Sequence, residues 1–137
     1  MTELPMRRSL FPLSNPKTLV VLDDLRDLAS LLADFAEICG WDAYAVNNKQ
    51  DFESAINKHS PSLVFLDVYM PEYDGVNALG FLKELDFTGH VCFISSCSEA
   101  TMKSMQDLAV GYGLNCCGSF SKPVNFKALF NLLYQID

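Results

Sequence analysis

Hydrophobic positions follow two different periods along this chain, and the two periods alternate. Short apolar runs predict buried strands, and the segments between them keep apolar residues three or four positions apart, which predicts helices. The expected strands cover residues 18–22, 41–46, 62–66, 90–94 and 115–120, and the helical segments cover 23–40, 49–61, 75–85, 98–113 and 125–137. Gly118 makes the last strand the weakest of the five, because glycine lowers strand propensity.

This alternation is typical of an α/β protein. It predicts a doubly wound, five-stranded parallel sheet with helices on both faces, for which 2-1-3-4-5 is a known strand order. In that order a crevice lies outside the carboxyl ends of strands 1 and 3. The length of 137 residues suits one domain, which we place at residues 18–137, and residues 1–17 are expected to form a flexible leader.

Composition and charge narrow the class of protein. The net charge is −7 with no basic stripe, so we expect no direct binding of nucleic acid. No apolar run has the roughly 18 residues of a membrane span, and the N-terminus lacks a signal-peptide pattern, so a cytoplasmic location is expected. The five cysteines form no C-x-x-C pair or zinc spacing, and we interpret them as reduced, small apolar residues.

Polar residues follow four of the expected strands. Asp23 and Asp24 follow the first, Asp67 the third, Ser95 the fourth and Lys122 the fifth. Because parallel strands end at one edge of a sheet, these side chains are expected to converge. Carboxylates that gather without a cation repel one another, and a bound Mg²⁺ together with the lysine would relieve that cost.

Each of these residues also has an ordinary structural interpretation. Asp24 is a favoured helix N-cap residue, and Ser95 or Ser96 would serve the later helix in the same way. Asp67 suits a turn, as Asp74 does before its glycine, and Lys122 suits a solvated loop. These alternatives explain the residues singly and do not explain their convergence.

The residue types favour phosphoryl chemistry. No glycine-rich phosphate cradle is present, and His59 and His90 fall at the opposite ends of their strands, which argues against nucleotide hydrolysis and Ser-His catalysis. A carboxylate beside Mg²⁺ can instead attack a phosphoryl group and form an acyl phosphate. A lysine would spread the charge on the transferring group, and the Ser95 hydroxyl could bond one of its oxygens.

In this order, Asp23-Asp24, Asp67 with "MPEYDG" after it, Ser95 and Lys122-Pro123 resemble the receiver domain of two-component response regulators. The resemblance covers residues 18–137 and implies the flavodoxin-like (βα)5 fold. It implies that Asp67 accepts a phosphoryl group from a histidine kinase or phosphotransfer protein. It also implies Mg²⁺ as cofactor, a switch hydroxyl at Ser95 and a phosphate-binding lysine at Lys122. The metal ligands would be Asp24, Asp67, Asp23 through water, and the Tyr69 backbone carbonyl.

Two features depart from the usual receiver pattern. Ser95 and Lys122 stand 27 positions apart, which is long, and the usual place of the switch aromatic, three residues before the lysine, holds Ser119. Phe120 follows it and, since strand side chains alternate, is expected to be mainly a core residue. The open alternative is a bulge at Gly118 that re-aims Phe120.

The segment "ATMKSMQDLAVGYGLNCCGSFSKPV" (100–124) narrows the resemblance to receivers joined to EAL-type cyclic-di-GMP phosphodiesterase domains. Such a C-terminal output domain would lie beyond these 137 residues. The expected function is a signalling switch with self-catalysed phosphoryl transfer and dephosphorylation, not an enzyme for a separate substrate. Two alternatives stay open: a non-phosphorylated interaction module, and a small phosphatase, which would want an acid where Tyr69 stands.

Overall fold

A computed structural model describes residues 17–136 of the chain. The expected leader therefore lies, apart from Lys17, outside the described residues. The elements are β1 (Thr18–Leu22), α2 (Arg26–Ile38), β2 (Asp42–Val46), α3 (Lys49–His59), β3 (Leu63–Leu66), α4 (Gly75–Glu84), β4 (His90–Ser95), α5 (Glu99–Gly111), β5 (Asn115–Ser121) and α6 (Phe126–Gln135). Every predicted strand and helix is present, with ends that differ by a few residues.

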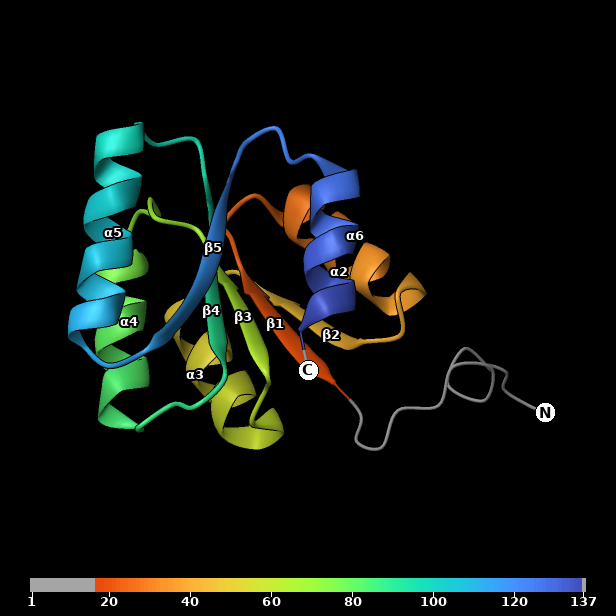
Figure 1. The fold of residues 1–137 in the computed structure, drawn as a ribbon. Helices are drawn as coiled ribbons and strands as arrows, with labels where there is room; N and C mark the ends of the chain where they lie inside the picture. The colour runs from red at the N-terminus through yellow and green to blue at the C-terminus, as the bar shows by residue number, and fades with distance from the viewer. Residues whose placement is uncertain (1–16, 137) are drawn as a thin grey trace.

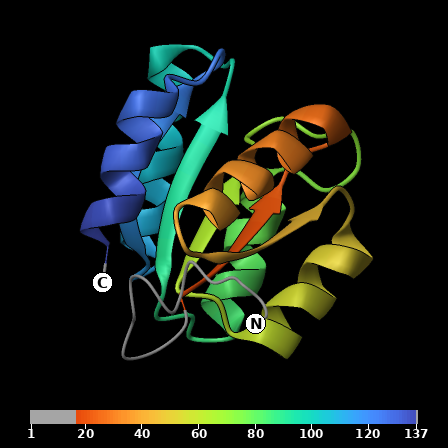
Figure 2. The ribbon, with the colours of Figure 1, turned by 90° about the vertical axis from the view of Figure 1, so that its right-hand side faces the viewer.

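The five strands form one parallel sheet in the order β2-β1-β3-β4-β5, which confirms the predicted fold. Helices α2 and α6 cover one face, and α3, α4 and α5 cover the other (Figure 1). Seen from the side, the arrows of β1 and β4 point toward the same edge of the sheet (Figure 2). No helix among residues 17–136 is long and apolar enough to cross a membrane.

Two apolar layers hold the sheet between its helices. One layer joins Phe93 and its neighbours to α3, α4 and α5, and the other joins Ile94 and its neighbours to α2 and α6. The central strands β1, β3 and β4 are apolar and almost wholly buried because both of their faces are covered. The edge strands β2 and β5 are partly exposed, which explains their weaker hydrophobic patterns.

Some of the polar residues considered above cap helices, and others lie at the edge of the sheet without capping a helix. Ser98, and neither Ser95 nor Ser96, caps α5 by accepting a hydrogen bond from the Thr101 N–H. Asp74, expected in a turn, is the N-cap of α4 and forms a reciprocal capping box with Asn77.

The start of α2 differs from the expectation. Helix α2 begins at Arg26, and its N-cap residue is Leu25, whose side chain makes no capping hydrogen bond. The interpretation of Asp24 as the N-cap of this helix is therefore wrong. Asp23 and Asp24 lie in the loop between β1 and α2 instead.

Strand β5 contains the bulge that the alternative interpretation of this strand required. Its register against β4 shifts between Val91 and Cys92, and Gly118 adopts a φ of +149°. Beyond the bulge Ser119 pairs with Phe93 and Phe120 pairs with Ile94, so the two side chains face opposite sides of the sheet.

Phe120 packs against the core layer under α2 and α6, which confirms its expected core role. Ser119 faces α5 and accepts a hydrogen bond of 3.1 Å from the Gln106 amide.

Candidate functional site

The polar residues predicted at the strand ends come together at one edge of the sheet. Asp23 follows β1, Asp67 follows β3, Ser95 ends β4 and Lys122 follows β5. Backbone hydrogen bonds hold these positions: the Asp67 N–H donates to the Leu22 carbonyl (3.0 Å), and the Lys122 N–H donates to the Ser95 carbonyl (3.1 Å). The sheet ladder therefore sets the spacing of the site.

A lysine and two carboxylates form the buried centre of the site. Lys122 Nζ lies 3.0 Å from Asp23 Oδ2 and 3.1 Å from Asp67 Oδ2, and the Lys122 side chain is only 14% exposed. The interpretation of Lys122 as a solvated loop lysine is therefore wrong. Burial by itself would lower the pKa of the ammonium, but the contacts with the carboxylates of Asp23 and Asp67 outweigh it and raise the pKa.

Asp23 keeps one carboxylate oxygen that no hydrogen bond satisfies. Its Oδ1 accepts a bond of 2.9 Å from the Leu25 N–H, whereas Oδ2 is buried and, among residues 17–136, accepts no hydrogen bond of good geometry. The Lys122 ammonium, 3.0 Å away, is the ion-pair partner of this oxygen. Burial raises the pKa of Asp23 to about 6; the Leu25 N–H and Lys122 oppose this rise, and the charge on Asp67 adds to it.

Asp67 is held from two sides. Its Oδ1 accepts a hydrogen bond of 3.2 Å from the Tyr69 N–H, and its Oδ2 accepts one of 3.1 Å from Lys122. The Tyr69 side chain is exposed, so it is the backbone of this residue that faces the carboxylate. The role of the Tyr69 carbonyl as a metal ligand stays a prediction.

Three carboxylates meet where the metal was expected. One oxygen from each of Asp23, Asp24 and Asp67 lies within 4.8 Å of the others, with Asp24 exposed and the other two buried. An all-oxygen donor set suits Mg²⁺ better than a softer metal. The cluster could hold such an ion.

Gly75 lets α4 approach the loop that carries Asp67. A Cβ atom at this position would lie 3.3 Å from the Asp67 carbonyl oxygen, 3.2 Å from Val68 Cα and 2.9 Å from Met105 Cε. The Gly75 N–H also donates to the Val68 carbonyl (3.1 Å). The Asp-Gly pair therefore combines a helix cap with a close backbone contact beside the site.

Ser95 is buried at the end of β4, and its hydroxyl accepts a hydrogen bond of 3.3 Å from the Cys97 N–H. The structure thus places Ser95 on the strand between those leading to Asp67 and Lys122. Its role as the switch hydroxyl stays a prediction.

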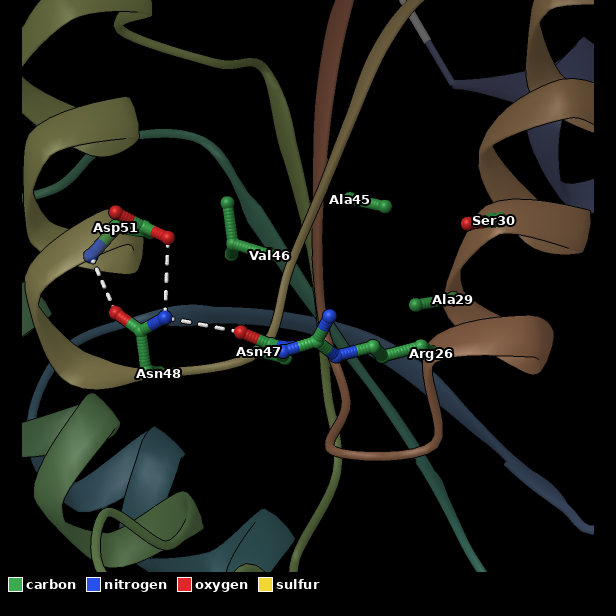
Figure 3. A pocket seen from close by; sticks show the side chains of 8 residues that line it. All are labelled: Arg26, Ala29, Ser30, Ala45, Val46, Asn47, Asn48 and Asp51. Atoms are coloured by element: carbon green, nitrogen blue, oxygen red, sulfur yellow. Dashed lines mark hydrogen bonds between the residues drawn. The ribbon is translucent and has the colours of Figure 1, made fainter.

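Two cavities near the site were missed by sequence reasoning. One, of about 370 Å³, opens beside Asp24 between the start of α3 and the loop of Met70 and Pro71. The other, of about 340 Å³, lies between α2, β2 and α3, where Arg26 extends toward Asn47 and Asn48 faces Asp51 (Figure 3). Asn47 and Asn48 both line this second cavity, and Asn48 is also the N-cap of α3.

The comparisons with known proteins agree with this geometry. The sequence profile of the response regulator receiver domain matches residues 19–134, and the chain belongs to this family. It is 24% identical over 110 residues to the polar-differentiation response regulator DivK of Brucella anthropi, covering 80% of this chain and 87% of that protein. It is 30% identical over 86 residues to the chemotaxis protein CheY of Bacillus subtilis, covering 61% of this chain and 71% of that protein.

Solved structures show the same fold. A response regulator from Colwellia psychrerythraea has a TM-score of 0.77 at 24% identity, with 88% of this chain and 95% of that chain covered. The chemotaxis protein CheY4 of Vibrio cholerae has a TM-score of 0.76 at 14% identity, with 90% and 100% covered. The chain is thus a receiver domain of two-component systems, a class of signalling switches.

Proposed function

We propose that Asp67 is the phosphoacceptor of a two-component signalling switch. The observation that carries this proposal is the placement of Asp67: a buried carboxylate at the end of β3, held by Lys122 and the Tyr69 N–H beside two further carboxylates. The donor would be a phosphohistidine of a histidine kinase or phosphotransfer protein. The phosphorus–nitrogen bond of the donor breaks, a phosphorus–oxygen bond to Asp67 forms, and the donor imidazole is released.

Residues of this chain would hold and neutralise the group being transferred. Asp23, Asp24, Asp67 and the Tyr69 carbonyl would bind Mg²⁺, which supplies positive charge that stabilises the phosphoryl oxygens during transfer. Lys122 already donates to Asp67 and would donate to a phosphoryl oxygen once that carboxylate carries the phosphoryl group. The Ser95 hydroxyl, one strand away, would donate to another oxygen and so report the phosphorylated state to β4 and α5.

The fold supports a readout at the β4–β5 edge of the sheet. Phosphorylation biases the equilibrium between two arrangements of a receiver, and a partner or an output domain binds one of them. An EAL phosphodiesterase output domain stays a prediction from the resemblance of residues 100–124.

The proposal is tested by intact mass spectrometry after incubation with acetyl phosphate and Mg²⁺. We expect the wild-type protein to gain the mass of one phosphoryl group, and only when Mg²⁺ is present. The Asp67→Asn variant should gain no such mass. Asparagine is nearly isosteric with aspartate, so the fold survives while the nucleophile is lost. Asp74→Asn is the matched control, because asparagine also caps helices and this variant keeps the nucleophile.

Labelling that persists in Asp67→Asn would assign the acceptor to another residue. A wild-type protein that never gains the phosphoryl mass would instead favour the interaction module that needs no phosphorylation.

A further inference from the structure

Three of the five cysteines gather where β5 pairs with β4. Cys92 lies on β4, and Cys116 and Cys117 lie on β5. All five cysteines are free thiols, and Cys92 is buried whereas Cys116 and Cys117 are partly buried. The receiver site uses none of these thiols.

The β5 bulge decides which of the paired cysteines faces Cys92. Val91 pairs with Cys116 and Cys92 pairs with Gly118, so Cys117 is the extra residue and lies opposite Cys92. Cys117 packs against the layer under α2 and α6, which contains Cys92, whereas Cys116 packs against the layer on the other face. Consecutive cysteines thus point to opposite sides of the sheet.

The spacing of the two strands suits a bond between Cys92 and Cys117. Neighbouring strands lie about 4.8 Å apart. Disulfides join residues whose Cα atoms are about 4.4–6.8 Å apart. A directly paired position in a regular sheet would hold the two side chains parallel, and Cys117, as the extra residue of the bulge, lies outside that regular register.

The two thiols also differ in reactivity. A hydrogen bond from the Cys92 thiol lowers the pKa of Cys117, although burial opposes this effect. The same hydrogen bond raises the pKa of Cys92 well above its ordinary value, and burial makes the second-largest contribution to this rise. Cys117 therefore has more thiolate character and more access to solvent, as the first sulfur to be oxidised must have.

We propose that Cys117 and Cys92 form a reversible disulfide across β4 and β5 when hydrogen peroxide acts as the oxidant. The Cys117 thiolate attacks one peroxide oxygen, the O–O bond breaks, and the departing hydroxide takes the proton lost by Cys117 and leaves as water. Cys117 is then a sulfenic acid. The Cys92 sulfur attacks the Cys117 sulfur, the S–O bond breaks, and the oxygen leaves as water with the Cys92 proton. Two thiols are oxidised and one peroxide is reduced to two waters.

Such a bond would join the two strands whose ends carry Ser95 and Lys122. Cys92 precedes Ser95 by three residues on β4, and Cys117 precedes Lys122 by five residues. The proposal concerns only bond formation, and it is tested without a phosphoryl donor, so its outcome is independent of the proposed role of Asp67.

The experiment treats reduced, desalted protein with one equivalent of hydrogen peroxide and measures its intact mass. We expect the loss of two hydrogen atoms, reversed by dithiothreitol. Alkylation followed by peptide mapping should find Cys92 linked to Cys117 in the wild-type protein, which requires no variant to fold. Cys116→Ala is the matched control, because it removes the neighbouring thiol on the opposite face and should leave the bond intact.

Two variants define the order of the steps. Cys117→Ala should lose the disulfide, and Cys92→Ala should leave Cys117 as a sulfenic acid that a dimedone probe traps. The proposal is overturned if mapping links Cys116 to Cys117, or if the wild-type protein gains oxygen on Cys117 without losing the two hydrogens. A disulfide that disappears in Cys116→Ala would overturn it as well.

Discussion

Asp23 holds a carboxylate in a place where its charge is poorly solvated. Its Oδ2 is buried with the Lys122 ammonium as its ion-pair partner, and burial raises the pKa of Asp23 to about 6 despite that partner. An aspartate in an unfolded chain has a pKa of about 3.9. The folded protein therefore binds this proton more tightly than the unfolded chain does.

This difference predicts how stability depends on pH in the absence of metal. The contribution of Asp23 to stability is fully present below about pH 4 and is lost as pH rises through about 6, by on the order of 1–3 kcal/mol. Urea unfolding in EDTA between pH 4 and 7 measures it. The free energy of unfolding of the wild type should fall relative to that of Asp23→Asn over this range. Parallel curves for the two proteins would contradict the shifted pKa.

At the scale of single elements, two glycines of α4 offer a matched comparison. A Cβ atom at Gly75 would press on Met105, Val68 and the Asp67 carbonyl, whereas one at Gly80 would meet nothing within 4 Å. Both positions lie in the same helix. Gly75 is the first residue of the helix and is tightly surrounded, whereas Gly80 lies in the helix interior with open space beside it.

We expect Gly75→Ala to destabilise the protein by about 1–3 kcal/mol, because the backbone beside Asp67 must move to relieve the contact. Gly80→Ala should stabilise it by up to about 1 kcal/mol, because alanine has the higher helix propensity. Chemical denaturation of the two variants measures both effects. Equal effects of the same sign would show that close packing at Gly75 is unimportant.

On strand β5, the role of the Phe120 ring can be tested in the same way. This ring packs under α2 and α6, while Ser119 faces α5 and bonds to Gln106. Phe120→Leu should therefore cost stability, about 1 kcal/mol. It should keep the changes in amide exchange of α5 that follow treatment with acetyl phosphate and Mg²⁺.

A stable variant that is phosphorylated normally, and whose α5 no longer responds, would make Phe120 the switch residue. Leu132→Ala serves as a control for loss of packing in the same layer, on a helix rather than on β5.

For the whole molecule, an acidic cluster that binds a cation would couple metal binding to folding. Asp23, Asp24 and Asp67 repel one another in the folded state and are far apart in the unfolded chain. A cation that binds the cluster stabilises only the folded state.

Mg²⁺ should therefore raise the melting temperature at neutral pH, and Asp24→Ala should remove most of that rise. The same variant should melt no lower than the wild type in EDTA, because one repelling charge is gone. Asp34→Ala, an exposed change on α2 outside the cluster, should respond to Mg²⁺ as the wild type does. Differential scanning calorimetry with and without Mg²⁺ makes the comparison, and a full response in Asp24→Ala would exclude Asp24 from the metal site.

The sequence by itself determined the fold class and the convergence of the site residues. Apolar runs typical of buried strands alternate along the chain with apolar residues at helical spacing. Parallel strands joined by helices end at one edge of their sheet. For that reason the positions of Asp23, Asp67 and Lys122 after their strands were enough to predict that these side chains meet.

Only the tertiary structure decided which residue does what at that edge. The choice of Ser98 over Ser95 as a cap depends on where the helix begins after the strand leaves the sheet. The ion pairs of Lys122 depend on burial by elements distant in sequence. The bulge that leaves Cys117 as the extra residue beside Cys92 is a property of the register between two strands. Register is set by pairing with a neighbour in space, so Gly118 suggested a bulge in β5 without determining which residues of β4 and β5 pair.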